Sequence, residues 1–255
     1  MKYSFSKIII FLGFIILIYS CSKDSGSSDS LAANTGTTTG QGGSLARFTI
    51  SGDYLYAVTN NSLYAYDIGD PANPVQTYMQ DIGFSVETIY PYGDKLFIGT
   101  TTGLFIYSIA TPSSPVRIGE ATHARSCDPV VANDSIAFVT LKGNSNCGPA
   151  ISGLYVHDIR NVLSPQLINT IPISSPEGLG LKESTLYVCC NTGGLKVFNV
   201  SNPVHPAEIR TITGAYFKDV IPFGDLLICY VSDGIMLYDI SDPTNPVQVK
   251  MITNS

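Results

Sequence analysis

The chain has 255 residues, of which 44% are hydrophobic and only 13% are charged, and this composition excludes a disordered protein. The formal net charge is −6 and no lysine and arginine cluster is present, which excludes a nucleic-acid-binding protein. The 15 tyrosines and 11 phenylalanines, without any tryptophan, favour strands over helices. The length allows one large domain or two small ones.

The N-terminus has the pattern of an export signal. Lys2 and Lys7 accompany an almost uninterrupted apolar stretch, residues 8–19, which is too short to span a bilayer comfortably. The sequence LIYSC, which ends at Cys21, resembles the lipobox of bacterial lipoproteins. The resemblance implies that residues 1–20 are a lipoprotein signal peptide and that the thiol and new amino group of Cys21 are acylated. The alternative is an ordinary signal peptide or a short membrane anchor with an incidental cysteine.

Residues 21–43 form a segment rich in serine, threonine and glycine. It carries too little apolar surface to fold, so we expect a flexible tether. Ser22, directly after the cysteine, is similar to the residue found in lipoproteins sorted to the outer membrane. The sequence thus predicts a cell-envelope protein attached through a lipid anchor, with its periplasmic or surface-exposed placement left open.

From residue 44 onward the chain is built from five repeats. Each repeat contains an apolar run followed by a proline-rich turn, and the runs are 63–68, 104–109, 154–159, 195–200 and 235–240. The starts of these runs are 41, 50, 41 and 40 residues apart. A period near 40 residues indicates a solenoid or a propeller.

Each repeat reads as four strands joined by short turns. In the second repeat these strands are predicted at residues 86–90, 96–99, 104–109 and 116–119, and the first turn is Gly93-Asp94. Radial arrangement of four-stranded antiparallel units gives a β-propeller, in which the first strand of each unit lines a central channel. The sequence therefore predicts an all-β fold, a propeller of five four-stranded antiparallel blades over residues 44–255. The alternative, a linear β-solenoid, usually has shorter rungs.

The segments LYAYDIGDPANPV (residues 63–75) and LYDISDPTNPV (residues 237–247) resemble the LVIVD repeat. The resemblance extends over all five repeats but is looser in the third, where Val162 replaces the first proline. It implies a surface or periplasmic β-propeller of a bacterial lipoprotein and supplies no catalytic residues. The aspartates that close the apolar runs are expected to accept N–H groups of the turn. A catalytic or metal-binding role is the alternative reading for them.

The third repeat departs from the period. Its second and third strands start 18 residues apart, from Ile136 to Leu154, whereas the hairpins of the first two repeats show a spacing of 8. The insert at residues 142–149 contains Cys147, and Cys127 begins the first strand of the same repeat. Both positions belong to the same end of a blade, so we predict a Cys127–Cys147 disulfide, which an exported protein permits. The remaining cysteines, Cys189, Cys190 and Cys229, are expected to be small buried apolar residues.

The first residues of the channel strands should surround one opening of the channel, at the same end as the insert. Counting back from each second strand gives a possible binding rim of Arg47, Glu87, Arg125, Asp128, Glu177, Lys218 and Asp219. Such a rim could bind a cation, a sugar or a cationic peptide, and paired carboxylates are also what glycoside hydrolysis requires. The remaining alternative is a solvated rim in which acids and bases pair with one another.

Other chemistry has no pattern in the sequence. The three histidines, His123, His157 and His205, are dispersed, which disfavours a metal site, and no phosphate-binding or dinucleotide-binding loop appears. We therefore expect no cofactor, no metal and no catalytic residue. The predicted function is a lipid-anchored binding or scaffold module for a protein or a glycan. The alternative is an extracellular carbohydrate-active enzyme that uses the channel carboxylates.

Overall fold

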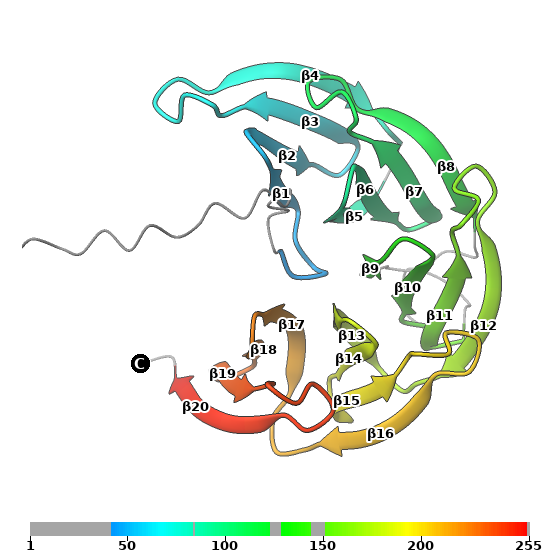
Figure 1. Ribbon diagram of the computed structural model, residues 1–255, viewed down its shortest axis with the longest axis vertical. Coiled ribbons are helices and arrows are strands. Elements are labelled where there is room, and N and C mark those ends of the chain that lie inside the picture. Colours follow the sequence, from blue (N-terminus) through cyan, green and yellow to red (C-terminus); the bar gives the residue numbers. More distant parts are fainter. Residues whose placement is uncertain (1–41, 84, 123–128, 144–150, 254–255) are drawn as a thin grey trace, which may run out of the picture. The chain divides into compact units, whose positions relative to one another are not determined.

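The computed structural model describes residues 42–83, 85–122, 129–143 and 151–253, which fall in one compact unit, residues 37–255. These residues form twenty strands, arranged as five sheets of four antiparallel strands (Figure 1). Each sheet is one blade and is made from one continuous stretch of chain, with its strands paired in sequence order. The predicted all-β propeller with five four-stranded blades is therefore confirmed.

The strands of each blade are numbered from the innermost to the outermost. Blades 1 and 2 consist of β1 (Phe48–Ser51), β2 (Tyr54–Val58), β3 (Ser62–Asp67), β4 (Val75–Asp81), β5 (Val86–Tyr92), β6 (Lys95–Thr100), β7 (Gly103–Ser108) and β8 (Val116–Thr122). Blade 3 consists of β9 (Val130–Ala132), β10 (Ile136–Leu141), β11 (Gly153–Asp158) and β12 (Gln166–Pro172). Blades 4 and 5 consist of β13 (Pro176–Lys182), β14 (Thr185–Cys190), β15 (Gly194–Asn199), β16 (Ala207–Ile212), β17 (Phe217–Phe223), β18 (Leu226–Val231), β19 (Gly234–Asp239) and β20 (Val247–Thr253).

The proline-rich turns are held by hydrogen bonds within each turn. The Asp67 carboxylate accepts the Gly69 N–H at 2.9 Å, and the Asp239 carboxylate accepts the Ser241 N–H at 2.8 Å. This bond from Ser241 lowers the pKa of Asp239 below its ordinary value. The carboxylates therefore do what the sequence predicted, since they satisfy backbone donors that would otherwise lack a partner in the turn.

The hydrophobic core lies between successive blades. One cluster of buried side chains joins blades 1 and 2, and others join blades 2 and 3, blades 3 and 4, and blades 4 and 5. Between blades 4 and 5, for example, Tyr187, Leu195 and Leu227 are fully buried. Full burial of a large apolar side chain contributes about 1.5–3 kcal/mol, so these contacts are the main source of stability.

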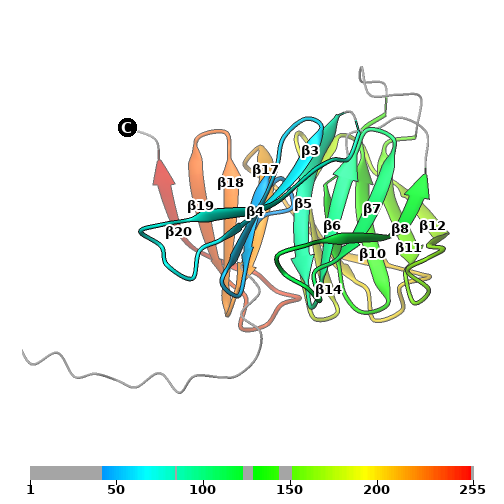
Figure 2. The same ribbon diagram turned by 90° about the horizontal axis from the view of Figure 1, so that it is seen from above.

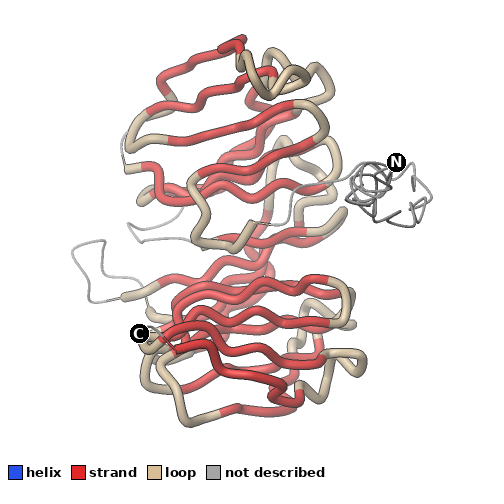
Figure 3. The backbone as a smooth tube through the Cα atoms, turned by 90° about the vertical axis from the view of Figure 1, so that its left-hand side faces the viewer, coloured by secondary structure: helices blue, strands red, loops and turns tan. Residues whose placement is uncertain are grey.

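The ring of blades is open between blade 5 and blade 1. Figures 1 and 3 show the two blades standing apart on either side of an opening. Among the described strands, extensive contacts join each blade to the next, but none joins blade 5 to blade 1. No core cluster of the described residues spans this opening either. The sequence predicted the number of blades correctly and did not predict the opening.

The three cysteines in the described part of the chain are free and buried, as predicted. Cys189 and Cys190 are neighbours on β14 and pack into different core clusters, because adjacent residues of a strand point to opposite faces. Cys21, Cys127 and Cys147 lie outside the described residues, so their lipidation and pairing stay predictions. Among the residues that the structure describes, no helix is long and apolar enough to cross a membrane.

Candidate functional site

The propeller has two ends, which differ in the turns that they carry (Figure 2). The proline-turn end carries the turns between the third and fourth strands, such as residues 68–74, and those between the first and second strands, such as Gly93-Asp94. The insert end carries the turns between the second and third strands, including the long β10–β11 connection. The predicted binding rim belongs to the insert end.

Two residues of the predicted rim make polar contacts there. The Arg47 guanidinium donates to the Val86 carbonyl at 2.7 Å and to the Asn60 side chain at 3.0 Å. The Glu177 carboxylate forms an ion pair with Lys142 at 2.5 Å. Both side chains therefore connect neighbouring blades.

Asp219, another member of the predicted rim, lies under residues 43–45. Its carboxylate accepts the Ser44 hydroxyl at 3.0 Å and the Leu45 N–H at 3.3 Å. Ser44 is itself buried and accepts the Leu179 N–H of blade 4 at 2.7 Å. The segment before β1 therefore crosses the inner strands and is fastened to blades 4 and 5.

Two glycines pack against the Asp219 carboxylate so closely that no larger residue fits at their positions. A Cβ atom added at Gly43 or at Gly178 would come within 2.2 Å of an Asp219 carboxylate oxygen. Burial raises the pKa of Asp219 above its ordinary value, although its hydrogen bonds act in the opposite direction. Asp219 is thus a half-buried hydrogen-bond acceptor that holds the N-terminal segment, and it is not an exposed member of a rim.

The remaining members of the predicted rim lie on inner strands or outside the described residues. Lys218 lies over the Tyr230 ring, with its Nζ atom 5.3 Å from the ring centroid, and Glu87 is half-buried on β5. Arg125 and Asp128 lie outside the described residues. Asp219 is covered by residues 43–45, and the described residues indicate no catalytic activity.

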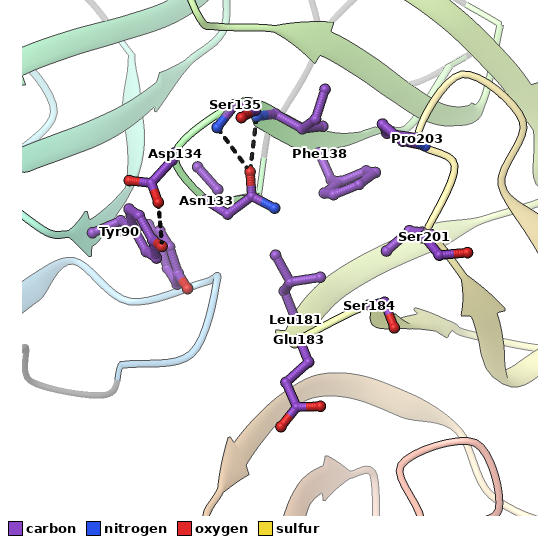
Figure 4. A pocket seen from close by; sticks show the side chains of 14 residues that line it. Tyr90, Asn133, Asp134, Ser135, Phe138, Leu181, Glu183, Ser184, Ser201 and Pro203 are labelled. Atoms are coloured by element: carbon purple, nitrogen blue, oxygen red, sulfur yellow. Dashed lines mark hydrogen bonds between the residues drawn. The ribbon is translucent and has the colours of Figure 1, made fainter.

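A hollow lies at the proline-turn end instead. It has a volume of about 520 Å³ and is lined by blades 2, 3 and 4 (Figure 4). A second hollow of about 210 Å³ lies between the inner strands of blades 2 to 5 and reaches Gly42. The two hollows share Tyr90, Tyr92 and Leu181, so they are adjacent.

The polar side chains of the larger hollow come from turns. Asn133 follows β9 and accepts the N–H groups of Ser135 at 3.0 Å and Ile136 at 2.9 Å, which fixes this turn. Asp134 projects beside the tyrosines and accepts the Tyr92 hydroxyl at 3.4 Å, as drawn in Figure 4. Ser184 and Ser201 add hydroxyl groups from blade 4.

Glu183, at the edge of this hollow, has an unfavourable backbone conformation. Its φ is +53°, in the left-handed region that favours glycine. At the same turn of blades 1, 2 and 5 the chain has glycine, with φ near +56° at Gly52 and Gly93 and +55° at Gly224. A non-glycine residue in such a conformation costs about 1–3 kcal/mol, and such residues cluster at functional sites. The geometry of the turn therefore does not explain why a glutamate, and not a glycine, occupies position 183.

The hollow contains the uncharged hydroxyl groups of two tyrosines, which lie beside carboxylates. Burial, with a smaller effect of Tyr92, raises the pKa of Tyr90 to about 12. Burial and the neighbouring Asp134 also raise the pKa of Tyr92. Both hydroxyls therefore keep their protons at neutral pH and can donate hydrogen bonds. Among the described residues, no group of three or more histidine, cysteine or acidic side chains could hold a metal ion.

The rim predicted from the sequence lies at the other end and does not include these residues. A signal was present, because the Gly-Asp turn of blades 1, 2 and 5 is absent from blades 3 and 4, which have Asp134-Ser135 and Glu183-Ser184 at this position. Tyr90 and Tyr92 carry no such signal, because the sequence pattern of a channel strand does not show which of its residues line a hollow.

A family model of the LVIVD repeat matches residues 42–79, 177–213 and 228–253, which correspond to blades 1, 4 and 5. LVIVD repeats are thus found in these three blades. The matched segments coincide with turn-and-strand units described above. No curated protein matches the chain significantly by sequence.

Solved structures that resemble this propeller are distant in sequence. AztD of Citrobacter koseri is 14% identical with a TM-score of 0.59, and the match covers 80% of this chain and 60% of AztD. The computationally designed protein Ika8 is 13% identical with a TM-score of 0.60, and the match covers 82% and 62%. A functionally unknown protein of Desulfotomaculum acetoxidans is 12% identical with a TM-score of 0.63, covering 80% and 67%. These likenesses support the fold alone. The chain spans about three fifths of the length of AztD and Ika8.

Proposed function

We propose that this LVIVD repeat propeller is a binding module that takes a glycan in the hollow at its proline-turn end. The observation that supports the proposal is the concentration there of the features that depart from the repeat. Glu183 replaces a turn glycine at an energetic cost, and Asp134 and Ser135 replace the regular Gly-Asp turn. A concave site with a few converging polar groups is the usual form of a small-ligand site.

The lining favours a carbohydrate over a protein surface. Tyr90 and Tyr92 offer aromatic groups, and Asp134, Asn133 and two serines offer donors and acceptors suited to hydroxyl groups. The volume of about 520 Å³ falls in the range typical of small-ligand pockets, whereas a protein partner would need a much larger surface. The acidic carboxylates also disfavour an anionic ligand.

A glycan array probed with the full chain tests this proposal. We expect a retained glycan whose binding weakens about tenfold in Asp134→Asn and in Tyr92→Phe, because each loses one hydrogen bond to the ligand, worth about 1.4 kcal/mol. Asp53→Asn is the matched control, since Asp53 occupies the corresponding turn in blade 1, away from the hollow. The proposal fails if no glycan is retained, or if both hollow variants bind as the unaltered chain does.

We also propose that the protein is held on the cell envelope by acylation of Cys21. The support is the basic and apolar N-terminus followed by LIYSC. Mass spectrometry of the N-terminal peptide from bacterially produced protein should find acyl groups on Cys21 and no residue before it. Cys21→Ala should abolish both. An unmodified Cys21 in the envelope fraction would contradict the anchor.

A further inference from the structure

The opening between blades 5 and 1 is bordered by two apolar sheet faces. In blade 5 this face includes Ile228, Tyr230, Ile235 and Leu237, with Tyr230 50% exposed and Ile235 37% exposed. The corresponding residues of blade 4 are Tyr187, Cys189, Leu195 and Val197, and all of these are fully buried by blade 5. The face of blade 5 thus has the composition of a buried blade face without the cover.

Blade 1 borders the opening with a second face of this kind. Its residues Leu55, Ala57, Tyr64 and Tyr66 correspond to Leu96, Ile98, Phe105 and Tyr107 of blade 2, which are buried against blade 1. In blade 1 the same positions are only partly buried, and Phe48 on the neighbouring strand is 64% exposed. The Tyr64 and Tyr66 rings stack on one another, with centroids 6.3 Å apart.

The two faces are of complementary types. Each blade has a face toward the next blade in the chain, here called the later face, and a face toward the preceding blade, here called the earlier face. The later face of each blade packs against the earlier face of the next, as in the cluster between blades 4 and 5. The opening leaves one later face, on blade 5, and one earlier face, on blade 1. The two cannot meet within one molecule, since blades 5 and 1 stand apart (Figure 3). The missing partner of each face is therefore present in every other copy of the chain.

We propose that two copies of the chain associate with their openings facing each other. A two-fold axis parallel to the channel places blade 5 of each copy against blade 1 of the other, so that both pairs of faces are covered by the same contact. Most oligomers have closed symmetry of this kind, because it satisfies every interface. Each contact would enclose several aromatic side chains, and an aromatic residue buries about 150–250 Å².

Sedimentation equilibrium of the full chain, in mild detergent because residues 8–19 are apolar, tests this arrangement. We expect the unaltered chain to be a dimer, and Tyr230→Asp in blade 5 and Tyr64→Asp in blade 1 each to be monomeric. Leu167→Asp is the matched control, because Leu167 is 54% exposed on the outer strand of blade 3 and should not affect association. Circular dichroism spectra and urea unfolding curves establish that each variant is folded.

Mixing the two variants distinguishes this dimer from other arrangements. A mixture of Tyr230→Asp and Tyr64→Asp chains has one unaltered contact, from blade 1 of the former to blade 5 of the latter, and should regain a dimer. A monomeric unaltered chain would overturn the proposal. So would dimerisation of Tyr64→Asp alone, which would mean that blade 5 packs against blade 5, and so would open-ended assemblies larger than a dimer.

Discussion

The fastening of the N-terminal segment can be tested through a single hydroxyl group. Ser44 is 1% exposed, and its Oγ atom donates to Asp219 at 3.0 Å and accepts the Leu179 N–H at 2.7 Å. The substitution Ser44→Ala removes both hydrogen bonds and should hardly change the backbone conformation. Asp219 then retains the backbone N–H donors of Ser44, Leu45 and Val220, and the Leu179 N–H loses this partner.

The expected cost follows from these two losses. A hydrogen bond to a charged group is worth about 1.5–3 kcal/mol, and a buried donor left without a partner costs about 1–3 kcal/mol. Some of this is recovered by relaxation, so we expect Ser44→Ala to lower the free energy of unfolding by about 3 kcal/mol. With a denaturant slope of about 2–3 kcal/mol/M in urea, the unfolding midpoint should fall by about 1 M.

The assay is urea unfolding at pH 7, followed by circular dichroism. Ser62→Ala serves as control, because Ser62 is 3% exposed but its hydroxyl has only a 3.3 Å contact with the adjacent Asn61. The control should cost less than about 1 kcal/mol. Equal costs for the two substitutions would refute the view that Ser44 fastens the segment to blades 4 and 5.

Three further predictions concern charge, strain and thiols. Between pH 4 and 7, the stability advantage of the unaltered chain over Asp219→Asn should be largest at pH 4 and should shrink as the pH rises through the raised pKa of Asp219. The reason is that the folded chain binds this proton more tightly than the unfolded chain does. Urea unfolding from pH 4 to 7 measures this difference, and a constant difference would contradict the prediction. Glu183→Gly should raise the free energy of unfolding by about 0.5–1 kcal/mol, since relief of the left-handed strain exceeds the entropy cost of glycine, whereas Glu87→Gly within a strand should lower it; loss of stability in both would argue against strain. Burial raises the pKa of Cys189 and raises that of Cys190 to about 11, so neither thiol should react with a thiol reagent at pH 8 until the chain unfolds, and fast labelling of either in the folded protein, located by peptide mapping, would contradict their burial.

Local features of the sequence determined the blades. A proline-rich turn needs only neighbouring residues, because Asp67 accepts the N–H of Gly69 within the same turn. Alternation along a strand likewise assigned Cys189 and Cys190 to opposite faces before their neighbours were known. The five repeats therefore predicted five blades of four strands, and the period predicted where each blade begins.

The location of the site depended on contacts that no local pattern contains. Asp219 matched the expected position for an exposed rim, yet residues 43–45 cross the inner strands and cover it. The hollow at the opposite end lies beside β9, which has only three residues, whereas β5, β13 and β17 have seven. Its lining combines side chains such as Tyr90 and Glu183 that are far apart in the chain.

The opening of the ring was also decided by tertiary packing alone. A repeat fixes the composition of both faces of a blade, so blades 1 and 5 carry the same apolar pattern as those between them. The angle between successive blades depends instead on how side chains of different sizes interlock, which the repeat does not specify. The sequence by itself determined what each blade is, and the packing between blades decided that the first and last do not meet.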